Sequence, residues 1–239
     1  MPVARLGDRP ERAGSFALDW LAADTSTLLD SLPAPAHLGG RLVRFCEVRD
    51  TALILGSSQP DSSVDAGVAA SLGVALLRRR AGGGAVLVAP AGQLWVDVFI
   101  PANDELFETD VGRSFHWLGD AFAAALHKTG AVSDVAVHNG PSIGTRWSRL
   151  LCFCGVGPGE VLVQGRKVLG LAQRRNRFGA WLHAMVPLAI DPDRTVALLA
   201  LAENDREAAT QALGESAAAV SAAPEVLTEL LVEELRRLS

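Results

Sequence analysis

The stretch RRRAGGGAV, residues 78–86, lies between two short apolar runs at 74–77 and 85–88. Three consecutive glycines cost backbone entropy, so they predict a place where the chain needs a bare backbone. Backbone N–H groups that hold a phosphate are one such need, and the adjacent arginines could contact the same anion. A tight turn with solvated arginines is the alternative. The glycine spacing differs from that of a dinucleotide-binding fingerprint or a P-loop, and no helix is predicted to follow. The stretch therefore predicts a strand–loop–strand unit.

Further strands and helices are predicted on both sides of this unit. Residues 41–48 and 51–55 are predicted to form a hairpin, and residues 93–100 alternate two sets of side chains on opposite faces of a strand. Other strands are predicted at 132–138, 160–163, 168–173 and 181–188, and helices at 15–31, 61–72, 110–129, 195–202, 206–213 and 224–238. Pro33 and Pro35 are expected to end the first helix. Because the strands come in hairpins and the helices do not alternate with them, the sequence predicts an α+β fold with a mixed, largely antiparallel central sheet flanked by helices.

The composition is that of an ordinary globular chain and excludes several classes of protein. The 239 residues are 49% hydrophobic and 21% charged, which rules out a disordered chain. A net charge of −5 argues against a nucleic-acid partner, because such proteins usually carry a basic face. Three cysteines are too few for a secreted disulfide scaffold, no apolar run reaches the roughly 20 residues of a membrane span, and the N-terminus lacks a signal-peptide block. We therefore expect a cytoplasmic protein with no membrane partner. No metal site is predicted, because the five histidines are scattered.

Two more motifs carry residues suited to chemistry. The stretch GRKVLGLAQ, residues 165–173, brings Lys167 from a glycine-bounded turn into a strand. Such a lysine is either solvated or serves as a point charge on a phosphate or carboxylate oxygen. The stretch CFC at 152–154 has cysteines too close to pair without strain. They are either small apolar core residues, or one of them is a nucleophile whose pKa a neighbouring base or cation lowers.

Taken together, RRRAGGGAV at 78–86 and GRKVLGLAQ at 165–173 resemble the lipoate–protein ligase family, within the broader group of lipoate ligases, octanoyltransferases and biotin ligases. The resemblance runs from about residue 53 to residue 187. It implies a mixed sheet flanked by helices, with residues 1–190 as the catalytic domain. Residues 191–239 are then expected to be a short C-terminal helical extension of the same domain.

The resemblance also implies a reaction and a set of site residues. In that family the carboxylate of lipoate attacks the α-phosphate of ATP with the help of Mg²⁺. The acyl-adenylate then gives its lipoyl or octanoyl group to a lysine on an acceptor domain of a 2-oxoacid dehydrogenase or a glycine-cleavage protein. By position, Lys167 matches the lysine that touches the acyl carbonyl and the α-phosphate, and Arg79 matches the arginine that holds the phosphate. The other residues expected to bind ATP or the acyl group are Gly82, Gly83, Gly84, Ala85, Val86, Gln173 and His183.

Several positions depart from the ligase pattern. Ala81 stands where a serine or threonine is common, Val88 and Ala89 replace a His-Asp pair, and Leu171 and Ala184 replace a serine and a glycine. The stretch from Cys152 to Lys167 resembles instead the cysteine-dependent branch, the octanoyl- and lipoyltransferases. In that branch the matching cysteine forms an acyl-thioester, and no ATP is needed because the acyl group arrives already activated.

Three hypotheses about the activity stay open. The first is an ATP-dependent ligase that uses Lys167. The second is a transferase with Cys152 as the nucleophile and Lys167 as the cation that polarises the acyl carbonyl. The third is a family member that only binds a lipoyl domain or an acyl ligand.

The sequence also makes predictions for other residues near these motifs. An apolar groove for the acyl chain could be lined by Trp95, Val96, Phe99 and Leu169, which are ordinary core residues otherwise. The basic run RRNR at 174–177 is either a solvated turn or a docking patch for an acidic acceptor domain. Asp97 is the one acid on the inner strands that we consider as a ligand for Mg²⁺.

Overall fold

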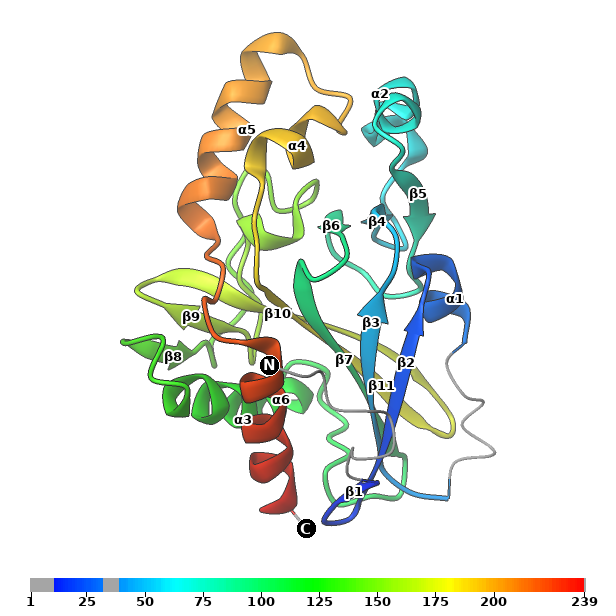
Figure 1. Ribbon diagram of the computed structural model, residues 1–239, viewed down its shortest axis with the longest axis vertical. Coiled ribbons are helices and arrows are strands. Elements are labelled where there is room, and N and C mark those ends of the chain that lie inside the picture. The colour runs from blue at the N-terminus through cyan, green and yellow to red at the C-terminus, as the bar shows by residue number, and fades with distance from the viewer. Residues whose placement is uncertain (1–10, 32–38, 239) are drawn as a thin grey trace.

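A computed structural model describes residues 11–31 and 39–238 of the chain. Its larger sheet has eight strands in the order β1-β2-β3-β7-β11-β10-β9-β8, and its smaller sheet has three strands in the order β5-β4-β6 (Figure 1). In the larger sheet β2 runs parallel to β3, and the other described neighbours are antiparallel. In the smaller sheet β4 is parallel to β5 and antiparallel to β6. This mixed, largely antiparallel arrangement confirms the predicted fold class.

The elements have the following bounds. The strands of the larger sheet are β1 (Arg12–Ala13), β2 (Phe16–Ala23), β3 (Leu42–Val48), β7 (Gln93–Pro101), β8 (Val135–Val137), β9 (Val161–Val163), β10 (Arg166–Asn176) and β11 (Gly179–Pro187). Those of the smaller sheet are β4 (Ala52–Leu55), β5 (Ala75–Arg78) and β6 (Val86–Val88). The α-helices are α1 (Thr25–Asp30), α2 (Ala66–Ser71), α3 (His116–Lys128), α4 (Pro192–Ala197), α5 (Glu203–Ser216) and α6 (Pro224–Arg236), and short 3-10 turns lie at Asp61–Ser63, Arg113–Phe115 and Cys152–Cys154.

The helices cover the sheets in two main cores. Phe122 of α3 and Leu231 of α6 share a buried cluster with Val98 of β7, so these two helices pack on the larger sheet. Leu213 of α5 shares a second cluster with Leu53 of the smaller sheet. Figure 1 shows α4 and α5 at the end of the molecule that holds α2 and the smaller sheet, with α3 and α6 toward the other end. The C-terminal helices thus contribute to both cores.

A third apolar cluster joins the two sheets. It contains Leu28 of α1, Ile54 of β4 and Trp95 of β7. Because the helices after residue 190 are built into the main cores, we propose residues 191–239 as an extension of the domain formed by residues 1–190. The candidate site lies beside the third cluster, where the two sheets meet.

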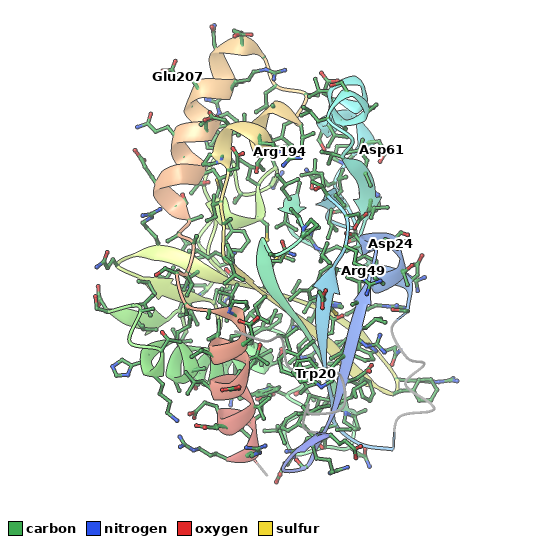
Figure 2. The ribbon with its side chains drawn as sticks, viewed as in Figure 1. Trp20, Asp24, Arg49, Asp61, Arg194 and Glu207 are labelled. Carbon is green, nitrogen blue, oxygen red and sulfur yellow. The ribbon has the colours of Figure 1, made fainter. Side chains whose placement is uncertain are left out.

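The prediction of one helix over residues 15–31 is wrong. The segment forms the strand β2, followed by the short helix α1, which Asp24 caps by accepting a hydrogen bond from the Thr27 N–H (Figure 2). Phe16 and Trp20 fit helical spacing, but together with Leu18 they also alternate with period two, and all three face the core of the larger sheet. Parallel pairing with β3 therefore overrides the helical pattern. Pro33 and Pro35, expected to end that helix, lie outside the described residues.

The predicted hairpin over residues 41–55 is also wrong. Both strands exist, but β3 belongs to the larger sheet and β4 to the smaller one. The Asp50 carboxylate accepts hydrogen bonds from the Thr25 N–H at 2.7 Å and from the Thr25 hydroxyl at 2.6 Å. These bonds tie the turn to the start of α1, and the chain leaves β3 without folding back on it.

Candidate active site

The glycine loop is pressed against the segment that carries Cys152. The Ala85 N–H donates to the Leu150 carbonyl at 2.7 Å, and the Cys152 N–H donates to the Ala85 carbonyl at 3.0 Å. A Cβ atom on Gly84 would lie 2.7 Å from backbone atoms of Leu151 and 2.8 Å from the Cys152 nitrogen. Gly84 is therefore needed for two stretches of backbone to approach each other, a use that the phosphate hypothesis did not foresee.

Arg79 closes the glycine loop from inside. Its guanidinium donates to the carbonyls of Gly82 at 2.7 Å, Gly84 at 2.9 Å and Ile54 at 3.2 Å. Gly83 has a φ of +101°, and a Cβ there would meet Arg79 Nη2 at 2.7 Å. Burial lowers the pKa of Arg79, and the charge of Cys152 opposes that shift. Arg79 thus sets the shape of the loop and lies within electrostatic range of Cys152.

Lys167 is buried and fully hydrogen-bonded. Its Nζ lies 3.0 Å from the carbonyl oxygens of Cys152 and Gly155 and 2.7 Å from the Glu160 carboxylate, and the residue is only 2% exposed. An ammonium group has three N–H donors, so these partners occupy all of them. Burial alone lowers the pKa of Lys167, but the attraction of Glu160 and of Cys152 raises it above its ordinary value. Lys167 therefore holds the Cys152 segment through contacts that are separate from those of the glycine loop.

Glu160 is a site residue that the sequence analysis missed. Its carboxylate also accepts hydrogen bonds from the Gly157 N–H at 2.7 Å and the Leu171 N–H at 2.9 Å. It therefore links the loop after Cys154 to β10. The signal available in the sequence was one acid placed seven residues before the candidate lysine, directly before an apolar run.

The three cysteines differ in their surroundings. Burial raises the pKa of the Cys154 thiol to about 11 and that of Cys46 well above 9.0. Cys152 is half-buried and lines two cavities. Since the thiolate is the nucleophilic form of cysteine, Cys46 and Cys154 are poorly suited to attack a carbonyl.

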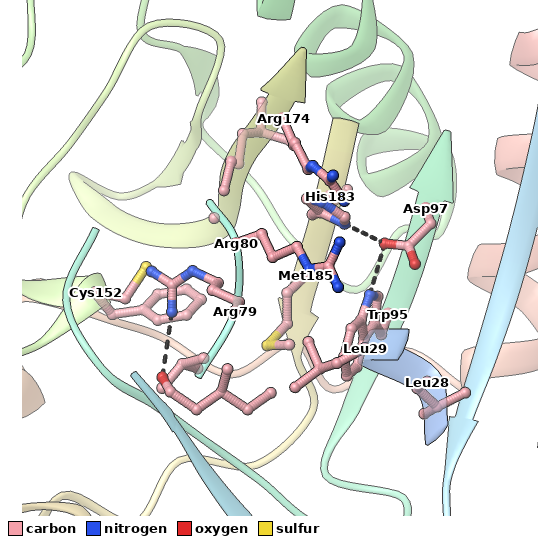
Figure 3. A pocket seen from close by; sticks show the side chains of 17 residues that line it. Leu28, Leu29, Arg79, Arg80, Trp95, Asp97, Cys152, Arg174, His183 and Met185 are labelled. Carbon is pink, nitrogen blue, oxygen red and sulfur yellow. Dashed lines mark hydrogen bonds and ion pairs between the residues drawn. The ribbon is translucent and has the colours of Figure 1, made fainter. Parts of the chain in front are cut away.

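The first cavity, of about 70 Å³, lies where the two sheets meet (Figure 3). Its wall combines apolar side chains with Arg79, Arg80, Arg174, Asp97 and His183. The second, of about 270 Å³, lies between β6 and α4 and has mostly apolar walls. Cys152 and Val86 border both cavities. A chain attached to Cys152 therefore has apolar space on either side.

Only some of the other predicted site residues line these two cavities. Arg79, Val86, Cys152 and His183 line the first cavity, and Ala85 lines the second. Neither of these two cavities is lined by Gly82, Gly83, Gly84, Lys167 or Gln173. The Gln173 amide instead donates to the Val111 carbonyl at 2.8 Å and the Ser114 hydroxyl at 2.9 Å. Of the predicted groove residues, Trp95 lines the first cavity, whereas Val96, Phe99 and Leu169 are buried and line neither.

Asp97 is joined to His183 and Trp95. One of its carboxylate oxygens lies 2.7 Å from His183 Nδ1 and accepts a hydrogen bond from the Trp95 indole N–H at 2.8 Å. Within the described part of the chain, no group of three His, Cys, Asp or Glu side chains is arranged to hold a metal ion. The side chain of Asp97, the candidate ligand for Mg²⁺, is 1% exposed, and its carboxylate is oriented toward these two partners.

A comparison with protein families shows which family the chain belongs to. A model described as the lipoyl protein ligase A/B catalytic domain matches residues 23–237. The chain belongs to this family. The lipoyl protein ligase A/B family consists of enzymes, both lipoate ligases and octanoyltransferases. None of the described helices combines the length and apolar character needed to cross a bilayer.

The chain is similar to proteins described as an octanoyltransferase and as lipoate ligases. The octanoyltransferase LipM of Exiguobacterium sp. is 24% identical over 151 residues, which are 62% of this chain and 54% of that protein, so the match spans about half of the curated relative. A bi-partite lipoate protein ligase from Thermoplasma acidophilum, studied with its E2 lipoyl domain, has 19% identity and a TM-score of 0.70, covering 94% of this chain and 82% of that one. A second T. acidophilum structure, with bound lipoic acid, has 19% identity and a TM-score of 0.68, covering 92% and 83%. At this identity the two structures show a shared fold.

Some side chains of the basic run at 174–177 already make contacts within the chain. Arg174 lines the first cavity, and Arg175 bonds to Gln173 and to the Thr109 carbonyl and lies over the Phe107 ring. Arg177 is exposed over the ring of Phe178. The docking patch predicted for an acceptor domain therefore reduces to the turn between β10 and β11, and it stays a prediction.

Proposed function

We propose that this chain is an acyltransferase in which Cys152 carries an octanoyl or lipoyl group as a thioester. Its acceptor would be a lysine on a lipoyl domain of a 2-oxoacid dehydrogenase or a glycine-cleavage protein. The observation that carries the proposal is the position of Cys152, which borders two apolar cavities and lies within electrostatic range of Arg79 and Lys167. The match to the octanoyltransferase LipM supports the same choice.

The transfer takes two steps. The Cys152 thiolate attacks the carbonyl of an acyl thioester on a carrier, the new C–S bond forms, and the carrier's thiolate leaves. The acceptor amine then attacks the acyl-Cys152 carbonyl, the C–N bond forms, and the Cys152 thiolate leaves. No ATP is consumed, because the acyl group is activated as a thioester throughout. An alkyl chain placed in either apolar cavity would gain about 0.8 kcal/mol for each buried CH₂ group.

Lys167 has a different role here from the one first expected. With all its donors used by Glu160 and by the carbonyls of Cys152 and Gly155, it has none left for the substrate carbonyl in this arrangement. We assign it to holding the nucleophile in place. The same contacts would have to break before Lys167 could reach the α-phosphate of a nucleotide.

A second candidate function, ATP-dependent ligation of lipoate or octanoate with Mg²⁺, has one observation in its favour. Three arginines, Arg79, Arg80 and Arg174, line the first cavity. Among the described residues, the guanidinium groups of Arg80 and Arg174 make no hydrogen bond or ion pair with another side chain or backbone group. Such groups are suited to a phosphate.

Mass spectrometry of the intact protein separates these functions. Incubation with an octanoyl-carrier protein and no ATP is expected to add one octanoyl group to the enzyme and then to a lipoyl domain. The Cys152→Ser variant should lose both products, while Cys154→Ala, the matched control, should keep them. Modification of the lipoyl domain that needs ATP and survives Cys152→Ser would establish the ligase instead. A lipoyl domain that binds but stays unmodified under both conditions would indicate a binding protein.

A further inference from the structure

We infer that His183 is the base that removes the proton from the acceptor lysine, and that Asp97 is the residue that positions it. This inference rests on the proposed function, since it concerns the second half of the transfer. A free lysine side chain is almost wholly protonated at neutral pH, and an ammonium group has no lone pair with which to attack a carbonyl. The enzyme therefore needs a group that accepts this proton next to the acyl-Cys152 thioester.

The geometry of the two strands fixes the imidazole. His183 of β11 and Asp97 of β7 are directly paired in the antiparallel ladder. The Asp97 carboxylate accepts a hydrogen bond from His183 Nδ1 at 2.7 Å and is held in turn by the Trp95 indole N–H at 2.8 Å and by the Cys46 thiol at 3.8 Å. Because the proton of the neutral ring sits on Nδ1, the lone pair lies on Nε2.

The imidazole is partly open to the cavity. Its side chain is 21% exposed, whereas Asp97 beneath it is 1% exposed. Figure 3 shows the His183, Arg80 and Arg174 side chains directed toward the same cavity, with Cys152 at its other side in this view. An amine that enters this cavity would therefore have the acyl group of Cys152 on one side and His183 on the other.

The other ionisable groups of the first cavity are unsuited to this task. Arginine stays protonated in proteins, which excludes Arg79, Arg80 and Arg174 as bases. Cys152 is the leaving group, and Asp97 is covered by His183. Outside the cavity wall, Lys167 and Glu160 are paired with each other. His183 is the group on the described wall of this cavity that has a lone pair to offer.

The charges that surround His183 also favour transfer of a proton from the acceptor lysine to the imidazole when the lysine enters the cavity. Arg174 comes from β10, and Arg79 and Arg80 come from the loop after β5. Arg44 and Cys46 lie on β3 behind Asp97, with Arg44 directly paired to Asp97 in the sheet. Like charges at short range repel an ammonium group, so the three arginines favour loss of the proton from a lysine that has entered the cavity, and Asp97 stabilises the positive charge that His183 gains. The proton then moves from the lysine nitrogen to Nε2, the C–N bond forms, and the C–S bond to Cys152 breaks.

The inference can be tested by giving the acyl-enzyme two different amines. Octanoyl-Cys152 enzyme is isolated, and the loss of its octanoyl group is followed by mass spectrometry after addition of a lipoyl domain or of hydroxylamine. Hydroxylamine is already neutral at neutral pH and needs no base. We expect His183→Gln to slow transfer to the lipoyl domain about 100- to 10,000-fold, the range of general base catalysis. The reaction with hydroxylamine should stay within about threefold of the wild-type rate.

The pH dependence gives a second readout. In His183→Gln the residual transfer should rise about tenfold per pH unit below pH 10, because it follows the fraction of free amine. The wild-type rate should rise much less steeply. Asp97→Asn should show the same selective loss with the lipoyl domain, since an amide can donate to Nδ1 and favour the wrong tautomer. His127→Gln, an exposed histidine of α3, is the matched control and should leave both reactions unchanged.

Two results would overturn the assignment. If His183→Gln slows both amines equally, the residue shapes the site and is not the base. If transfer to the lipoyl domain keeps its wild-type rate, another group takes the proton. A wild-type enzyme that never forms octanoyl-Cys152 is a different outcome, because it contradicts the proposed function before either amine is added.

Discussion

Replacing Glu160 with glutamine is expected to lower the free energy of unfolding by about 3–5 kcal/mol, the range found when one partner of a buried ion pair is removed. Lys167 would then keep its charge at a position that is 2% exposed, with two carbonyl oxygens as its remaining partners. The Gly157 and Leu171 N–H groups would also lose a charged acceptor. Acyl transfer should fall with stability, because the same contacts place the Cys152 segment.

Urea denaturation of the two proteins measures this difference directly. Glu105→Gln is the matched control: Glu105 lies 2.8 Å from Arg41 but its side chain is 76% exposed, so its loss should cost less than about 1 kcal/mol. A double variant, Lys167→Met with Glu160→Gln, should recover much of the stability, because no unpaired charge remains buried. If Glu160→Gln costs no more than the Glu105 control, the buried pair does not hold the segment together.

The dependence of this contribution on pH follows from the raised pKa of Lys167. Burial opposes the charged form, but Glu160 stabilises it more strongly, so the folded-state pKa lies above 10.5. A group with a raised pKa contributes its full stability below the unfolded value and loses it as the pH rises through the folded one. The contribution of this pair to the free energy of unfolding should therefore be constant around neutral pH. The difference in free energy of unfolding between wild type and Glu160→Gln should narrow only under strongly alkaline conditions.

The fold was predictable where local signals and long-range pairing agree. The glycines at 82–84 between two apolar runs identified the loop before β6, and the alternation over residues 93–100 identified β7. The helix predicted at 15–31 failed because Phe16 and Trp20 satisfy both a helical and a strand period, and only the partner strand β3 decides between them. The order of strands within two separate sheets has no local signature either.

The sequence predicted individual residues of the candidate site but not the contacts between them. Motif positions drew attention to Cys152, Lys167, Arg79 and His183, and the structure gathers three of these on one cavity with Lys167 behind it. Glu160 was missed because its role depends on the Lys167 ammonium group and on the N–H groups of Gly157 and Leu171, which lie in a loop and in β10. Such a partner appears only when the chain is folded.

Replacing Gly84 with alanine is expected to slow acyl transfer at least about 100-fold, because a displacement of roughly 1 Å at the reacting groups has an effect of that size. The new Cβ would lie 2.7 Å from the Leu151 carbonyl carbon and nitrogen and 2.8 Å from the Cys152 nitrogen. All three are backbone atoms, so no side chain can rotate away to make room. Either the Cys152 segment must be displaced, or the glycine loop that Arg79 holds must move away from that segment.

Gly82→Ala is the matched control for this variant. Gly82 lies in the same loop, has no atom within 4 Å of an added Cβ, and does not adopt a positive φ. It should keep the wild-type rate to within about threefold, since exposed substitutions without a packing conflict have small effects. Transfer rates measured with the same octanoyl donor and lipoyl domain check both variants. Cys152 is bonded to this loop through the Ala85 carbonyl, so a normal rate in Gly84→Ala would mean that the nucleophile is positioned from the Lys167 side alone.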